Sequence, residues 1–259
     1  MTSTRPDPTD KELEQTDLRG EPQRSINPVL RFFSLLWLRL NRSRYRSRAN
    51  RLVLEKLGDI NLVIMPGVLN PVLLRTGAIL AEAALCRPTA ATAAGDLMPR
   101  VLDMGTGSGI GAIAAAHRGF HVVGVDLNPD AVRCARINVL LNRVEDRVQL
   151  REGDLFDPVA GERFDLVLFN PPFFFGSPET PADLAWRSAD VIERFAAGLD
   201  RMLTPEGQAL IVLSTDGGQQ RMLGALEEQG FRCDLETRKH FGNEIVSVFL
   251  ARRPENADR

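Results

Sequence analysis

The feature that most constrains the fold is the change of rhythm after Pro99, from which short β-rich runs alternate with helical segments. Helices between consecutive strands require crossover connections, so this alternation predicts an α/β domain with a mainly parallel, doubly wound sheet. The predicted strands are 100–104, 121–125, 148–151, 164–169 and 208–213, and the predicted helices are 110–117, 129–141, 181–202 and 219–229. The last two β-rich runs, 231–237 and 244–251, are close in sequence and predict an antiparallel pair of strands at one edge of the sheet.

The region before Pro99 has a different character. Residues 1–25 are polar and predict a disordered tail, and residues 28–57 have a helical pattern. The segment from Arg24 to Arg51 holds eight arginines and no Asp or Glu. Two interpretations stay open for it: a helix with a solvated arginine face, or a contact with RNA or a membrane surface. Beyond it, 62–74 predicts short strands around a turn, about 74–85 predicts a helix, and 87–99 predicts a linker.

The composition limits the classes of function. The chain has 259 residues with a net charge of −2, so it has no overall attraction to nucleic acid or anionic membranes. Its three cysteines form no C-x-x-C pair and its three histidines lack metal spacing, so no metal site is expected. The N-terminus lacks the apolar region of a signal peptide, and the run Val29–Leu40, broken by two arginines, is too short for a membrane span. A cytoplasmic location is expected.

These patterns divide the chain into four parts. We expect a tail over 1–25, an accessory region of helices and short strands over 26–99, the main α/β domain over 100–253, and a second tail over 254–259. Ligands of mainly parallel sheets bind at the carboxyl ends of the strands, so the residues just after each predicted strand are the place to look for chemistry.

The first predicted strand leads into a glycine-rich turn, Asp103 to Gly109, with the pattern D-x-G-x-G-x-G. Glycines allow a ligand to approach the backbone, and the helix that follows begins with unpaired N–H groups. The spacing of Gly107, Gly109 and Ala112 also fits the dinucleotide pattern G-x-G-x-x-G/A, so an NAD(P)-dependent oxidoreductase stays an alternative. Asp103 argues against it, because a carboxylate suits a cationic amino group better than a pyrophosphate.

Carboxylates also follow the second and third predicted strands. Asp126 stands about 20 residues beyond the glycines, the position from which a carboxylate hydrogen-bonds a ribose diol. The alternative for Asp126, capping the next helix, is weaker because Asn128 before Pro129 suits that role. Asp154 could accept a hydrogen bond from an adenine amino group, with Leu155 among its apolar neighbours, or could be an ordinary turn residue.

The deciding motif follows the fourth predicted strand and reads Asn170-Pro171-Pro172-Phe173. Two prolines fix φ and remove two N–H donors, which leaves a rigid turn that accepts hydrogen bonds. An amino or amide nitrogen that donates to the Asn170 side chain and the Pro171 carbonyl, with Phe173 packed behind it, would aim its lone pair at an electrophile. The arrangement therefore suits methyl transfer to nitrogen from a sulfonium.

Together, these motifs resemble those of the class I methyltransferase superfamily, in the branch with an N-P-P-[FY] motif. The branch includes HemK-like glutamine methyltransferases and small-domain methyltransferases of ribosomal RNA bases. The resemblance implies a Rossmann-like, seven-stranded sheet with an antiparallel last strand, S-adenosyl-L-methionine as methyl donor, and Asn170 to Phe173 as the catalytic motif. The cofactor-binding residues expected are Asp103, Gly105, Thr106, Gly107, Gly109, Asp126, Leu127, Asp154, Leu155 and Asn170.

The acceptor stays open at this point. Protein glutamine, an RNA base and a small molecule all fit the motif. Phe173 stands where the glutamine methyltransferases usually have Tyr, and the N-terminal region resembles neither group closely. The resemblance places the segment from Val63 to Leu74 near the cofactor. A non-catalytic relative that binds a partner through Arg24–Arg51 is a further alternative.

Overall fold

The computed structural model describes residues 51–87, 98–172, 174–175, 187–188, 190–215, 218–241 and 244–254. The predictions for both tails, the apolar run, the Arg24–Arg51 segment up to residue 50, and most of the linker lie outside these residues, and so does Phe173. Among the helices that the structure describes, none has the length and hydropathy that crossing a membrane requires.

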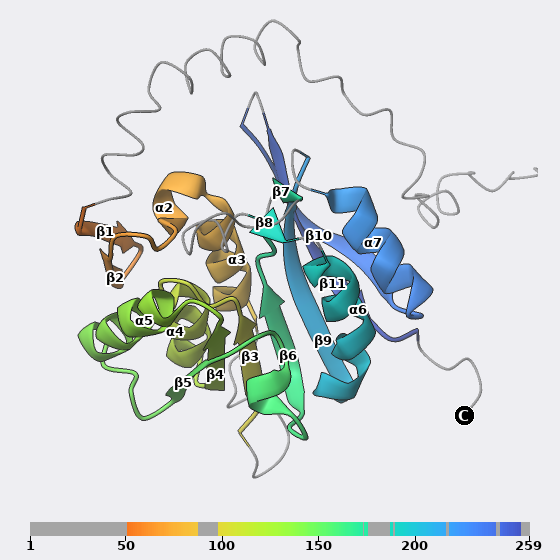
Figure 1. Cartoon of the computed structure of the whole chain (residues 1–259), viewed down its shortest axis with the longest axis horizontal. Helices are drawn as coiled ribbons and strands as arrows, with labels where there is room; N and C mark the ends of the chain where they lie inside the picture. Colours follow the sequence, from red (N-terminus) through yellow and green to blue (C-terminus); the bar gives the residue numbers. More distant parts are fainter. Residues whose placement is uncertain are drawn as a thin grey trace, which may run out of the picture.

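The centre of the molecule is a seven-stranded sheet in the order β10-β11-β9-β6-β3-β4-β5 (Figure 1). Its strands are β3 (Arg100–Met104), β4 (His121–Asp126), β5 (Val148–Glu152), β6 (Phe164–Phe169), β9 (Leu203–Ser214), β10 (Arg232–His240) and β11 (Ile245–Arg252). Neighbouring strands from β9 to β5 run parallel, whereas β11 is antiparallel to both β9 and β10. The predicted Rossmann-like sheet with a reversed last strand is confirmed.

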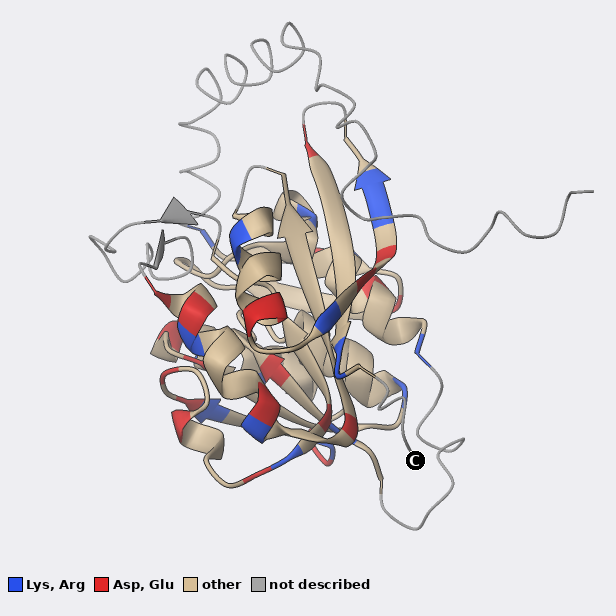
Figure 2. Cartoon of the chain, turned by 90° about the vertical axis from the view of Figure 1, so that its right-hand side faces the viewer, with Lys and Arg blue, Asp and Glu red and all other residues tan. Residues whose placement is uncertain are grey.

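Alternation along the strands creates two hydrophobic layers. Val101 and Leu168 face one layer, which is covered by α3 (Thr76–Leu85), α4 (Ile110–His117) and α5 (Pro129–Leu141). Leu102 and Phe169 face the other, which is covered by α6 (Val191–Met202) and α7 (Gln219–Glu228). Burial on both faces is the reason for nearly continuous apolar strands, and most of the sheet ribbon in Figure 2 is accordingly uncharged.

The N-terminal part of the described chain begins with a hairpin of β1 (Val53–Leu57) and β2 (Ile60–Ile64), followed by α2 (Pro71–Leu74). The helical prediction for 28–57 is therefore wrong over β1, because these residues pair with β2 across the turn at Gly58. Short strands around a turn were expected over 62–74. The start of this segment belongs to β2, but its end forms α2, because the Asn70 side chain accepts hydrogen bonds from the N–H groups of Val72 and Leu73.

The hairpin does not form a core of its own. Ile60, Leu62 and Ile79 belong to the same buried cluster as Val101 and Leu210 of the sheet. Figure 1 shows the hairpin beside α5 and α3 beside the sheet. The predicted boundary near residue 99 remains a proposal. Residues before and after it pack in the same buried cluster, so it divides the sequence into regions but does not divide the core.

A second correction concerns the helix predicted over 181–202. The structure begins this helix, α6, at Val191, and Arg187–Ser188 (β8) pairs with Phe174–Phe175 (β7) instead. The buried residues of α6 start at Ile192 and continue at helical spacing through Phe195 and Leu199, so the helix from Val191 buries one apolar face. A short 3-10 helix, η2 (Asp157–Val159), follows β5.

Candidate active site

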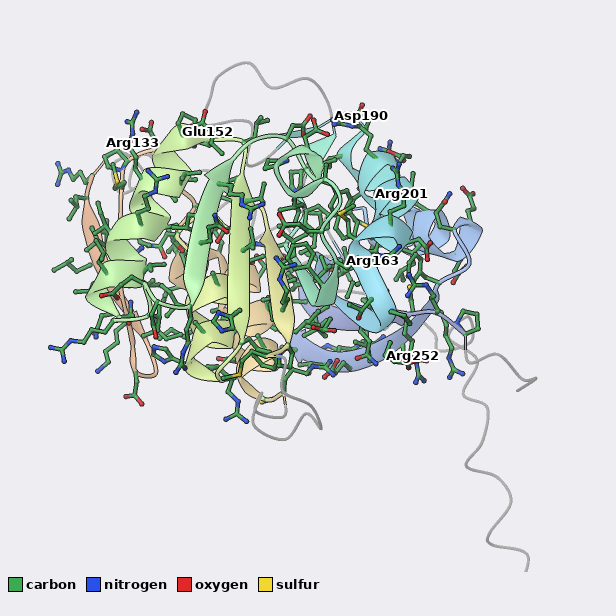
Figure 3. The ribbon with its side chains drawn as sticks, turned by 90° about the horizontal axis from the view of Figure 1, so that it is seen from below. Arg133, Glu152, Arg163, Asp190, Arg201 and Arg252 are labelled. Carbon is green, nitrogen blue, oxygen red and sulfur yellow. The ribbon has the colours of Figure 1, made fainter. Side chains whose placement is uncertain are left out.

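A cavity of about 350 Å³ opens where β3, β4, β5 and β6 end. Its wall combines the glycine turn, the residues that follow β4, β5 and β6, and the segment from Gly67 to Leu80. Figure 3 shows Glu152, at the end of β5, and Asp190, at the start of α6, at the same edge of the molecule, with Arg252 toward the opposite edge. The cavity thus lies at the edge that parallel topology predicts for a ligand.

The glycine turn is built around the buried carboxylate of Asp103, which is 4% exposed. Its Oδ2 accepts hydrogen bonds from Thr106 Oγ1 at 2.6 Å and from the N–H of Ala112 at 2.9 Å. Burial raises the pKa of Asp103 to about 6, against the opposing effect of these two hydrogen bonds, and Asp126 adds a smaller increase. The carboxylate therefore orders the turn from within as well as lining the cavity.

The glycines are required by the shape of the turn. Gly105, Gly107 and Gly109 have φ of +66°, +56° and +83°. A Cβ on Gly111 would lie 2.6 Å from Asp103 Oδ1, so this fourth glycine is needed for helix α4 to pass the carboxylate. The backbone of Gly105 and Gly107 can accordingly approach a ligand closely, whereas Gly109 packs toward Ala135 of α5.

Asp126 ends β4 and is held by the backbone on both sides. Its Oδ2 accepts the N–H of Gly107 at 2.8 Å, and its Oδ1 accepts the N–H of Asn128 at 2.9 Å. Burial raises the pKa of Asp126, and the two hydrogen bonds oppose that rise. Asn128 caps α5 by accepting the N–H of Asp130, so capping does not depend on Asp126. Each carboxylate oxygen keeps acceptor capacity for a further donor.

Asp154 lies in the cavity wall, but its carboxylate already has a partner. Arg194 Nη2 of α6 contacts Asp154 Oδ2 at 2.7 Å, and Arg194 Nη1 lies 4.0 Å from Asp190. The hydrogen bond with Asp154 raises the pKa of Arg194. Arg194 lines the same cavity and was missed in the sequence, because nothing local links two residues 40 positions apart.

Asn170 follows directly after β6, whose last residue, Phe169, stacks on Phe195 of α6 with ring centroids 4.0 Å apart. Asn170 Oδ1 is buried and accepts no hydrogen bond from any residue that the structure describes. Asn170 and Pro172 belong to the cavity wall, and Pro171 is buried beside them. Asn170 thus belongs to the cavity wall and carries a buried carbonyl oxygen for which the described residues supply no donor.

The structure brings most of the predicted site residues into one wall: Asp103, Gly105, Thr106, Gly107, Asp126, Leu127, Asp154, Leu155, Asn170 and Pro172. Gly109 and Pro171 are not part of it, and Phe173 lies outside the described residues. The predicted segment from Val63 to Leu74 reaches the wall through Gly67, Val68 and Leu69. No cluster of three or more His, Cys, Asp or Glu side chains suited to a metal ion occurs among the described residues.

Comparison with known proteins adds a family. The model of the family described as methyltransferase small domain matches residues 89–236. A release factor glutamine methyltransferase of Geobacter sulfurreducens is 32% identical over 198 residues, which cover 71% of this chain and 65% of that protein. A tRNA1(Val) (adenine(37)-N6)-methyltransferase of Tolumonas auensis is 30% identical over 171 residues, which cover 61% of this chain and 71% of that protein.

Other relatives match over a smaller part of their length. The chain spans about half the length of the tRNA1(Val) (adenine(37)-N6)-methyltransferases of Porphyromonas gingivalis that it matches. Among solved structures, the 16S rRNA N2 G1207 methyltransferase of T. thermophilus, in complex with AdoMet and guanosine, superposes with a TM-score of 0.58 at 21% identity. The match covers 79% of this chain and 50% of that one. This likeness supports the fold.

Proposed function

The chain belongs to the methyltransferase small domain family, and we propose that Asn170 holds a planar nitrogen of the acceptor against the methyl group of S-adenosylmethionine. The chain is an S-adenosylmethionine-dependent N-methyltransferase. Its family membership rules out the NAD(P)-dependent oxidoreductase, and its methyltransferase relatives favour an enzyme over the non-catalytic relative. The roles of individual residues and the identity of the acceptor are the proposal.

The cavity has donors and acceptors that suit S-adenosylmethionine. Asp126 has remaining acceptor capacity for the ribose hydroxyl groups, and the positive φ of Gly105 and Gly107 lets the backbone come close to the ligand. The carboxylate of Asp103 suits a cationic amino group. Leu127 and Leu155 supply apolar surface in the same wall. When bound, S-adenosylmethionine supplies a methyl group on a positively charged sulfur that a nitrogen lone pair can displace.

The observation that carries the proposal is the buried Oδ1 of Asn170 without a partner. A buried carbonyl that lacks a donor costs about 1–3 kcal/mol, so this atom favours an acceptor molecule that brings an N–H group. An N–H held by Asn170 Oδ1 fixes the nitrogen and leaves its lone pair to point elsewhere. Two prolines keep the neighbouring backbone from offering competing N–H donors.

Orientation and charge stabilisation supply the catalysis in this proposal. As the acceptor nitrogen displaces the methyl group from the sulfonium of S-adenosylmethionine it would gain positive charge, which the Asn170 carbonyl dipole would stabilise. The methylated nitrogen would then lose a proton to water. No dedicated base is needed, which agrees with a wall whose carboxylates are engaged with Thr106, Gly107 and Arg194.

The acceptor class is part of the proposal. The relatives act on a glutamine amide and on adenine N6, which are both planar nitrogens with N–H donors. We therefore expect a protein glutamine, an RNA base amino group or a small amide or amine. A contact with RNA or a membrane through Arg24–Arg51, and a cytoplasmic location, also remain predictions.

The test is transfer of a labelled methyl group from S-adenosylmethionine to a fractionated lysate, with protein, RNA and small molecules separated. Wild-type protein should label one fraction, and Asn170→Ala should not. Asn142→Ala, an asparagine outside the cavity wall, is the matched control and should label that fraction at the wild-type rate. Equal labelling by Asn170→Ala and wild type would refute the role of Asn170, and absence of label in every fraction would refute the proposed acceptor classes.

A further inference from the structure

Asn138 of α5 and Asn142, which caps the C-terminal end of α5, bind the backbone of β2 as a neighbouring strand would. Asn138 Oδ1 accepts the N–H of Val63 at 2.7 Å, and its Nδ2 donates to the Val63 carbonyl at 2.9 Å. Asn142 does the same with Asn61, at 3.0 and 2.7 Å. Four residues along a helix rise about 6 Å and two along a strand about 6.6 Å, so the spacings match. Together the asparagines fasten the hairpin to α5.

Asn138 makes one contact that Asn142 does not. Its Nδ2 also donates to the carbonyl oxygen of Ser108 at 2.8 Å, so one carboxamide joins β2 to the glycine turn. The side chain is fully buried, at 0% exposure, and both of its N–H groups and its oxygen are engaged. No water can readily replace a group in this position, because the site is enclosed by α5, β2 and the turn.

The carbonyl of Ser108 lies where the glycine turn passes into α4. It belongs to the peptide bond that leads into Gly109, the residue before α4, which has a φ of +83°. Another peptide group of the turn, the N–H of Gly107, is held by Asp126. Asn138 and Asp126 therefore hold two different peptide groups of the turn, and Ser108 itself lines the cavity.

We propose that Asn138 is a positioning residue that couples the N-terminal hairpin to the cofactor-binding turn. The chain passes from Val63 to Gly67, Val68 and Leu69, which form part of the cavity wall. Order gained at the turn on cofactor binding is transmitted through Asn138 to β2 and to this wall. The proposal rests on the proposed function, because the turn is taken as the cofactor site. Coupling of this kind is reciprocal, so breaking the link between the turn and the hairpin at Asn138 weakens cofactor binding.

The first experiment measures the Kd of S-adenosylhomocysteine by titration calorimetry. Asn138→Ala should weaken binding about tenfold. Asn142→Ala removes the other pair of bonds to the hairpin but leaves Ser108 held, and it should change the Kd less than about twofold. Thermal unfolding of both variants shows whether they are folded. An Asn138→Ala protein that is less stable yet binds as tightly as wild type would overturn the proposal, since Asn138 would then be structural only.

A second measurement covers the case in which Asn138→Ala does not fold. Hydrogen exchange of wild-type protein is followed with and without S-adenosylhomocysteine. The amide of Val63 should exchange more slowly with ligand, and that of Asn61 should change less, although neither residue lines the cavity. Unchanged exchange at Val63 while the glycine turn is protected would overturn the proposal. Failure of wild type to bind S-adenosylhomocysteine would instead refute the proposed function.

Discussion

The two ends of the cavity differ in how completely their polar groups are satisfied. At the glycine turn, Asp103 and Asp126 each accept two hydrogen bonds from the protein itself. At the end of β6, the buried Oδ1 of Asn170 has no such partner within the described parts of the chain. The polar groups at the glycine turn are satisfied by the protein alone, whereas Asn170 Oδ1 is satisfied by the acceptor in the function proposed above.

This difference has a kinetic meaning. The glycine turn is already ordered by these hydrogen bonds, and we call it the prebuilt end of the cavity. An ordered site lowers the entropic cost of binding, so changes there should act mainly on cofactor affinity. An unsatisfied group whose partner arrives with the acceptor should act mainly on the chemical step. The two ends can therefore be separated experimentally by comparing kcat with the Kd of S-adenosylhomocysteine.

The largest effect is expected at Asn170. Asn170→Ala should lower kcat by about 100-fold or more, because the acceptor nitrogen loses both its orientation and the dipole that stabilises its charge. The Kd of S-adenosylhomocysteine should stay within about twofold of wild type. Steady-state kinetics with the acceptor found by fractionation, together with calorimetry, measure both quantities. A loss of affinity as large as the loss of kcat would show that the two ends are not separate.

The next largest effect is expected at Asp126, where the change should fall on cofactor affinity and not on kcat. Asp126→Ala should raise the Kd of S-adenosylhomocysteine by about 100-fold, since hydrogen bonds to a charged group contribute about 1.5–3 kcal/mol each. Asp130→Ala is the matched control, because Asp130 is exposed, pairs with Arg133 and lies outside the cavity wall. Calorimetry that finds the two variants equally tight would remove Asp126 from the cofactor site.

The sequence predicted the prebuilt end better than the other parts, for a physical reason. The bounds of β6 and α5 agree with their predictions because a continuous apolar run and an Asn-Pro cap are local signals. The bonds from Asp126 to Gly107 and from Asp154 to Arg194 span 19 and 40 residues. The first could be inferred from motif spacing and the second could not, because no motif includes Arg194.

The errors have the same origin. The strand Val53–Leu57 follows a stretch of helical apolar spacing, and only its pairing with β2, across the turn, makes it a strand. The helix predicted over 181–202 begins at Val191 in the structure, and its buried face begins at Ile192. The role of Asn138 depends on Val63, 75 positions away. Contacts between distant segments decide these features.

A third prediction concerns pH at the prebuilt end. Burial raises the pKa of Asp103 to about 6 from 3.8, so the carboxylate is mostly neutral at about pH 5 and charged at about pH 7.5. Affinity for S-adenosylmethionine should therefore rise over this range, by up to about tenfold, as the attraction for its amino group appears. In Asp103→Asn the dependence should disappear. Calorimetry across this range that gives a flat profile for wild type would separate Asp103 from the cationic group.

The raised pKa of Asp103 has the opposite effect on the folding stability of the protein without ligand, which falls as pH rises. Because the folded pKa of Asp103 lies above the unfolded value, the folded state holds the proton more tightly, and the stability that this provides is lost as pH rises from about 4 to about 6. Denaturant unfolding should show a smaller loss in Asp103→Asn than in wild type, because the raised pKa of Asp126 contributes to both proteins. Opposite pH trends for stability and for cofactor affinity would show that the charged form of Asp103 lowers the stability of the fold and strengthens cofactor binding.

The smallest effect is expected where α6 meets the prebuilt end, at the pair of Arg194 and Asp154. Their side chains are 44% and 39% exposed, and surface pairs of this kind contribute about 0–1 kcal/mol. Arg194→Met should weaken S-adenosylhomocysteine about two- to fivefold, with a smaller loss at high salt because the ion pair is screened. Arg201→Met, on the same helix but outside the cavity wall, is the control.

A double-mutant cycle decides what the pair does. If Arg194 acts by holding Asp154 in place, then Arg194→Met and Asp154→Asn should together cost no more affinity than either alone, because each removes the same interaction. If the two effects add, Asp154 meets the ligand independently of Arg194, as an acceptor for the adenine amino group would. The first result extends the prebuilt character of the glycine turn to the start of α6. The second makes Asp154, like Asn170, a group whose role depends on the ligand.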